Sequence, residues 1–144
     1  MADVYGPVDF LVLEYPSDSD GEMTARALSA LVDQGVVALY DLMVVRREPD
    51  GSAQEIDLGS GSSHAPAAFA AFTGARSGLL GPEDVTEAAN ALEPGTSAVV
   101  IVYENRWAVP FVTAARAEGV EVVASARLTA QEIMETLDEL EAIS

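Results

Sequence analysis

The pattern of apolar and polar residues predicts alternating strands and helices. Short apolar runs at 8–15, 36–47, 53–58, 96–104 and 120–128 are typical of strands. The first and fourth runs are apolar on both sides of the pleat, as in strands that are covered on both faces. Asp50 and Gly51 favour a tight turn between the second and third runs, so these two runs are predicted to form an antiparallel hairpin.

Capping residues predict four helices among these strands. Ser19 and Glu22 form a capping box for the first helix, and Gly35 supplies its left-handed end. Pro82 stands at the first position of a short second helix, followed by acidic residues that suit the positive end of a helix dipole. A third helix follows the fourth strand, and a second capping box at 129–132 opens the last one.

Two parts of the chain repeat one pattern. A strand ending in an acid and a tyrosine leads to a helix, a glycine and a strand that opens with valine, once over 8–47 and once over 96–128. Two such units with right-handed crossovers form an antiparallel sheet with helices on one face. We therefore predict an α+β fold, an α/β sandwich, with a ferredoxin-like core, an extra hairpin strand and additional helices. Coincidence is the alternative, because the strand-helix-strand unit is common.

Strands that are apolar on both sides need cover on the second face of the sheet. The candidates are the helix after Pro82, the C-terminal helix, the Gly/Ser/Ala-rich segment at 59–81, or a second copy of the chain. The 59–81 segment has no clear periodicity, and we interpret it as a lid or a docked loop within one domain that spans 1–144.

Composition and charge limit the classes of function. The chain has 144 residues and a mass of 15.1 kDa, with 24 acidic residues against 7 arginines and a formal net charge of −17. This charge repels phosphate backbones and anionic lipids, so we expect no nucleic-acid or membrane partner. The chain has no cysteine and its N-terminus does not resemble a signal peptide, so we expect a cytoplasmic protein.

Six motifs carry a resemblance to a known family. They are "DGEM" (20–23), "LVDQGVVALYDL" (31–42), "REPDGS" (47–52), "GPEDV" (81–85), "LEPGTSAVVIVYENRWA" (92–108) and "RLTAQEI" (127–133). With them the chain resembles an uncharacterised, mainly actinobacterial family of unknown function. That family is distantly similar to bacterial stress-associated or membrane proteins with a longer apolar Gly/Ala-rich insert. Because 59–81 is too short for a membrane hairpin, the resemblance implies no membrane role here.

The stretch "YENRWAVPF" (103–111) contains the most conspicuous candidate residues. The structural interpretation is that Asn105 caps a helix, Arg106 pairs with a carboxylate, and Trp107 wedges the helix against the end of the sheet. The alternative is an anion-binding corner with Arg106 at a helix N-terminus and Trp107 as its wall. His64, the only histidine, is expected to be a solvated loop residue, because the sequence has no nucleophile elbow to accompany it.

The residues indicate no catalytic group, metal site or cofactor. "SDSDGE" (17–22) lacks the later ligands of a calcium loop, and "GSGSS" is not followed by the lysine of a phosphate loop. We predict a non-catalytic interaction or regulatory module that self-associates, with a dimer favoured and a protein partner as a further possibility. The alternative is a small-ligand sensor or small enzyme of the dimeric α+β barrel type. Its pocket residues would be Tyr15, Tyr40, Tyr103, Asn105, Arg106 and Trp107, with His64 on the lid. A third hypothesis is that the acidic surface binds a basic partner.

Overall fold

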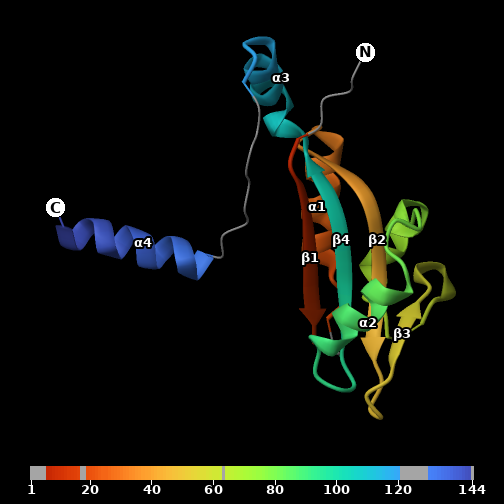
Figure 1. Ribbon diagram of the computed structural model, residues 1–144. Helices are drawn as coiled ribbons and strands as arrows, with labels where there is room; N and C mark the ends of the chain where they lie inside the picture. The colour runs from red at the N-terminus through yellow and green to blue at the C-terminus, as the bar shows by residue number, and fades with distance from the viewer. Residues whose placement is uncertain (1–5, 17–18, 63, 121–129, 144) are drawn as a thin grey trace. The chain divides into compact units, whose positions relative to one another are not determined.

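The computed structural model describes residues 6–16, 19–62, 64–120 and 130–143, and Figure 1 shows the order of their elements. They belong to two compact units, Met1–Thr113 and Ala114–Ser144. The first unit holds the sheet and the second holds helix α4, Ala130–Ile143, which confirms the predicted final helix. The predicted strand at 120–128 and the capping residue at 129 lie outside the described residues, apart from Val120. The single domain stays a prediction.

Within the described residues, four antiparallel strands form one sheet in the order β1-β4-β2-β3. Their bounds are β1, Val8–Tyr15; β2, Val37–Arg47; β3, Ala53–Ile56; and β4, Ser97–Asn105. Because β1 and β2 both run antiparallel to β4, they are parallel to each other, and helix α1 (Glu22–Asp33) connects them across β4. The predicted α+β fold is confirmed, and this order is compatible with a ferredoxin-like core.

The predicted hairpin of β2 and β3 is confirmed. The two strands pair antiparallel, with Val44 opposite Ile56 and Arg47 opposite Ala53. Gly51 in the connecting turn has a φ of 90°, a conformation that glycine adopts without steric cost. The strand β3 has only four residues and ends the sheet on this side.

Helix α1 begins differently from the prediction. Gly21 precedes the helix with a φ of 70°, and Asp20 rather than Ser19 accepts a hydrogen bond from the backbone of Glu22, at 3.0 Å. The Ser19 hydroxyl instead accepts from the Gly21 N–H, at 3.3 Å. The left-handed turn at Gly21 displaces Ser19 from the capping position, so the predicted capping box is wrong. The predicted end of the helix is confirmed, because Gly35 has a φ of 73°.

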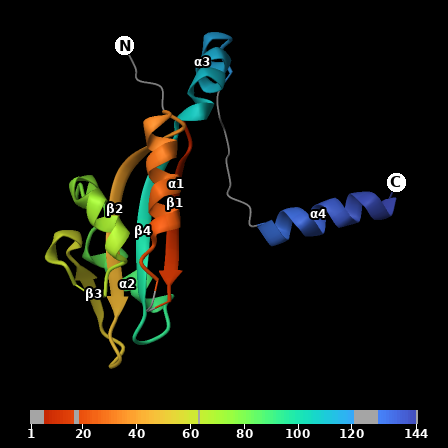
Figure 2. The same ribbon diagram turned by 180° about the vertical axis from the view of Figure 1, so that it is seen from behind.

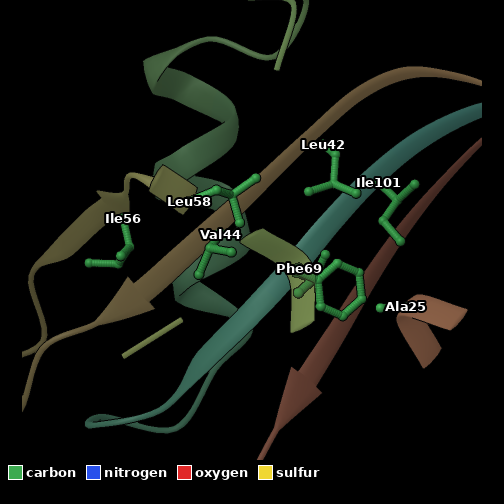
Figure 3. Packing of buried hydrophobic residues seen from close by; sticks show 8 residues of the cluster. Ala25, Leu42, Val44, Ile56, Leu58, Phe69 and Ile101 are labelled. Carbon is green, nitrogen blue, oxygen red and sulfur yellow. The ribbon is translucent and has the colours of Figure 1, made fainter. Parts of the chain in front are cut away.

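One face of the sheet packs against α1 and the predicted lid. Figure 3 shows Phe69 over Ile101 of β4 and close to Ala25 of α1, with Leu42 and Val44 of β2 in the same cluster. Phe69 lies in η2, a 3-10 segment at Ala67–Ala75, and is fully buried. This part of the 59–81 segment is therefore docked on the sheet. Figure 2 shows α1 on this face from behind.

The other face packs against helix α2, Pro82–Asn90, which lies in front of the sheet in Figure 1. Alternate residues of the same strands, Met43 and Val45 of β2 and Val100 of β4, contact Ala88 and Ala89 of α2 in a second apolar cluster. The expected cover of the second face is thus supplied by the helix after Pro82. At about 1.5 Å per residue its nine residues extend only about 13 Å.

Cover is thinner on the β1 side of the sheet. Val8 is 51% exposed and Phe10 is 42% exposed, although both belong to a sequence run that predicted burial on both faces. The sheet therefore has a well-packed centre at β2 and β4 and an apolar, partly exposed margin at β1.

Candidate functional site

The seven residues proposed from sequence do not form one pocket. The structure places Tyr103, Asn105 and Trp107 beside a groove on the α1 face, Tyr40 and Arg106 at a buried carboxylate, and Tyr15 and His64 at a small cavity. Tyr15 pairs with Ser97, at the start of β4, whereas Asn105 ends that strand. The small cavity is therefore at the opposite end of β4 from the groove.

The buried carboxylate belongs to Glu104, which is fully buried. It accepts hydrogen bonds from the backbone of Gly6 at 2.7 Å and from the Tyr40 hydroxyl at 2.9 Å. Arg106 donates to the same carboxylate at 3.3 Å, which confirms that this arginine pairs with an acid. Tyr40 lies at a bulge in β2, because Leu39 pairs with Tyr103 whereas Asp41 pairs with the neighbouring Val102. The geometry favours a structural role for Arg106.

The groove on the α1 face is an apolar hollow of about 380 Å³. Leu11 and Leu13 of β1 and Ile101 of β4 lie on the sheet side, with Leu28 and Leu31 on the helix side. Tyr103, Asn105 and Trp107 line it as well. Its volume suits a hydrophobic group, because most of its lining side chains are apolar.

Two predictions for this end of β4 are wrong. Trp107 is 65% exposed, so it is not wedged between a helix and the end of the sheet. Asn105 precedes the short 3-10 turn η3, Arg106–Ala108, but makes no side-chain capping bond. Its amide instead donates to the Pro7 carbonyl at 3.0 Å and to Asp9 at 2.9 Å, and its oxygen accepts from the Trp107 indole at 3.2 Å. The bonds to Pro7 and Asp9 tie the start of β1 to the end of β4, and the cap is unused.

Sequence reasoning missed the most connected polar residue of the sheet, Asp41. It is fully buried, and its carboxylate accepts from the backbone N–H groups of Leu42 at 2.9 Å, Ser77 at 2.8 Å and Leu80 at 2.7 Å. Arg76 donates to the same group at 2.6 Å. A signal existed, because a single acid inside the apolar run "VVALYDLMVV" must find partners if the strand is buried.

These bonds hold the chain where it passes from one face of the sheet to the other. Phe69 packs on the α1 face and Leu80 on the α2 face, and Arg76 lies between them. Arg76 also donates twice to Glu55 of β3, at 2.8 and 3.1 Å. The Asp41–Arg76–Glu55 cluster therefore clamps the crossing segment to β2 and β3.

The charges of this cluster stabilise one another. Burial would raise the pKa of Asp41, but the bonds from the Leu80 and Ser77 backbones and the positive charge of Arg76 outweigh it and lower that pKa below the usual range. The pKa of Arg76 is raised, chiefly by its hydrogen bond to Glu55. Both groups are charged throughout the neutral range.

A second cavity of about 380 Å³ lies beside the clamp. Leu42, Ile56 and Leu58 line it with Glu55, and Arg76 borders it. Both Glu55 oxygens already accept from Arg76, so these two charged groups of the cavity wall are engaged with each other.

The described ranges contain neither a cluster of metal ligands nor a membrane-spanning helix. Within 6–16, 19–62, 64–120 and 130–143, no three His, Asp or Glu side chains converge as metal ligands. In the same part of the chain, no helix combines the length and the apolar character needed to cross a bilayer. The buried carboxylates of Asp41 and Glu104 are each surrounded by donors of this chain, which is the arrangement of structural rather than reactive acids.

Comparison with known proteins places the chain in a family. The model of a family of unknown function, DUF6325, matches residues 4–143, and the chain belongs to that family. The searches of curated proteins and of solved structures returned no match. The predicted membership of an uncharacterised family is confirmed, and it brings no activity with it.

Proposed function

We propose that this chain is a non-catalytic interaction module that associates with a second copy of itself through the β1 side of the sheet. The observation that carries the proposal is the apolar surface on that side. The groove beside β1 is hollow and apolar, and Trp107, which lines it, is 65% exposed. Val8 and Phe10 are exposed on the opposite face of the same strand. Exposed apolar surface of this kind is typical of interaction sites.

The reason for association differs from the one that the sequence suggested. The second face of the sheet has cover of its own from α2, so a bare face no longer requires a partner. The support now comes from the β1 side, where a protruding indole and a hollow groove lie on one surface. A two-fold contact brings the same surface of each copy together, so a protrusion of one copy can enter the hollow of the other.

Charge gives this proposal a distinctive salt dependence. Two copies that each carry −17 repel one another at low ionic strength. Salt screens that repulsion and does not weaken apolar contacts, so association is expected to strengthen as salt rises. A complex with a basic partner, the hypothesis based on charge alone, would weaken instead.

The test is light scattering coupled to size-exclusion chromatography, from about 50 mM to about 500 mM salt, a range over which screening increases strongly. The disrupting variant is Leu31→Glu, because Leu31 lines the groove and is 40% exposed. Met23→Glu is the control on the same helix, since Met23 is 87% exposed and does not line the groove. We expect a dimer that Leu31→Glu alone dissociates. A monomer at high micromolar concentration in all salts, or equal effects of the two variants, would refute the proposal.

The ligand-sensor alternative has narrower support. Of its seven residues, three line the α1-side groove and four do not, so one pocket cannot use them all. A stress-associated role and a cytoplasmic location rest on the resemblance and on composition, and they belong to the proposal on those grounds only.

A further inference from the structure

Three polar side chains form a row across the end of the sheet on the α1 face. Tyr15 of β1 pairs with Ser97 of β4, and Ser97 pairs on its other side with Arg46 of β2. Residues directly opposite one another in antiparallel strands project from the same face, about 5 Å apart from strand to strand. Three strands therefore bring a phenol, a hydroxyl and a guanidinium into one line.

The docked segment covers this row and leaves a small cavity. His64, Ala65 and Pro66 of that segment lie over it, and the cavity has a volume of about 40 Å³. Tyr15 packs edge-on against Phe69, with ring centroids 5.9 Å apart, so the core fixes the position of the phenol. A cavity needs about 10–15 Å³ to hold one water molecule, so this one accommodates a few waters or one small charged group.

Among the described residues, two buried polar atoms that belong to lining residues of this cavity have no hydrogen-bond partner. They are the Tyr15 hydroxyl and the Arg46 Nε. Glu48 lies 3.3 Å from that Nε as an ion pair, but it does not form a hydrogen bond with it. A different nitrogen of Arg46, Nη1, donates a hydrogen bond to the Gly95 carbonyl at 3.3 Å. An unmet buried donor is unfavourable, and here two such atoms belong to residues that line one cavity.

We propose that this cavity is a binding site for a small anionic group, a carboxylate or a phosphate, held by Arg46 and Tyr15. A guanidinium can only donate, and a phenol can donate, so both unmet atoms suit an acceptor. Both the guanidinium and the phenol form stronger hydrogen bonds with an anionic oxygen than with a neutral one. The proposal is independent of self-association, because neither Tyr15 nor Arg46 lines the groove beside β1.

Electrostatics set the expected strength. Glu48 competes for the Arg46 guanidinium, and the net charge of −17 opposes any anion. Binding is therefore expected to be weak for the bare ions and to improve when the anionic group belongs to a larger molecule that reaches the open side of the cavity.

The experiment uses the full chain and three sodium salts, chloride, acetate and phosphate, at matched ionic strength. Thermal unfolding followed by circular dichroism and direct titration calorimetry report binding. We expect a saturable rise in the unfolding temperature with acetate or phosphate above that with chloride. The acetate and phosphate arms distinguish a carboxylate ligand from a phosphate ligand.

Matched variants assign the effect to the cavity. Tyr15→Phe removes only the unmet hydroxyl, so it should leave the free protein as stable as before and weaken anion affinity by about tenfold or more. Arg46→Lys keeps the charge but loses the Nε donor, and it should weaken affinity similarly. Tyr40→Phe is the control, because the Tyr40 hydroxyl donates to Glu104 instead. It should lower stability and keep the affinity.

The possible results distinguish a specific anion site from a general effect of salt. Equal responses to all three salts are an effect of ionic strength and overturn the proposal, since the cavity then holds water only. Unchanged affinity in Tyr15→Phe also overturns it. Loss of the response in both Tyr15→Phe and Arg46→Lys, with Tyr40→Phe unaffected, establishes the site.

Discussion

Replacing Asp41 with asparagine tests the clamp on the crossing segment. Each oxygen of the Asp41 carboxylate accepts two hydrogen bonds, from Leu42 and Ser77 on one and from Leu80 and Arg76 on the other. Asparagine has one oxygen and one NH₂ group, so in either orientation two donors would face another donor. The variant keeps the size of the side chain and removes its charge and half of its accepting capacity.

The expected loss follows from those broken bonds. Breaking a buried pair by removing one partner costs about 3–5 kcal/mol, and each unmet donor alone costs about 1–3 kcal/mol. We therefore expect Asp41→Asn to lower the free energy of unfolding by about 3–5 kcal/mol. That is a large share of the about 5–15 kcal/mol of an ordinary domain, and it corresponds to a fall in Tm of about 10 °C or more.

Urea unfolding followed by circular dichroism measures this loss. Glu55→Gln is the matched control, because Glu55 pairs with the same Arg76 but its side chain is 36% exposed. Its pair is worth about 0–1 kcal/mol. The reasoning fails if Asp41→Asn lies within about 0.5 kcal/mol of wild type, the usual range of surface substitutions, or if the control costs as much.

The pH dependence of stability follows from the same residue. Because folding lowers the pKa of Asp41, its contribution is fully present above the unfolded-state pKa of about 3.9 and is lost as pH falls through the lower folded-state value. Wild type should lose stability below about pH 4 more steeply than Asp41→Asn. Parallel curves for the two proteins would show that Asp41 binds its proton equally in both states.

Three further comparisons test the packing and the buried hydrogen bonds. Phe69→Ala should cost about 3–5 kcal/mol in urea unfolding, because the ring is fully buried; a loss below about 1 kcal/mol would mean that the docked segment does not fix the core. Gly21→Ala should cost more than Gly35→Ala, since both have positive φ but only a Cβ at Gly21 would lie 2.9 Å from Phe69; equal losses would contradict this contact. Glu104→Gln should lower Tm, because the buried carboxylate accepts from three donors; an unchanged Tm would show that these bonds are not stabilising.

Local signals in the sequence predicted most of the elements of the fold. Asp50 and Gly51 predicted the hairpin, Pro82 the helix on the second face, and Gly35 the end of α1, because each acts through its own backbone conformation. The prediction for Ser19 failed because the left-handed Gly21 next to it changes which side chain reaches the helix N-terminus.

The candidate site was predicted less well, since its residues depend on partners far away in the sequence. The sequence favoured Asn105 as a helix cap, but its amide donates to Asp9 and to Pro7, which are 96 and 98 positions away. Arg106 did find an acid, as charge alone suggested. Tyr15 and Arg46 meet only through strand register, and no local pattern encodes which residues lie opposite one another across β4.

The shortness of β3 bears on what association through β1 can build. With four residues, three of them exposed and two of these the polar Gln54 and Glu55, this strand offers a further chain few positions to pair with. If copies join through the β1 edge of the sheet and not through the β3 edge, the joining edge of each copy is used up once two copies have paired. Copies that join in the proposed way would accordingly stop at a closed pair and would not polymerise into fibres.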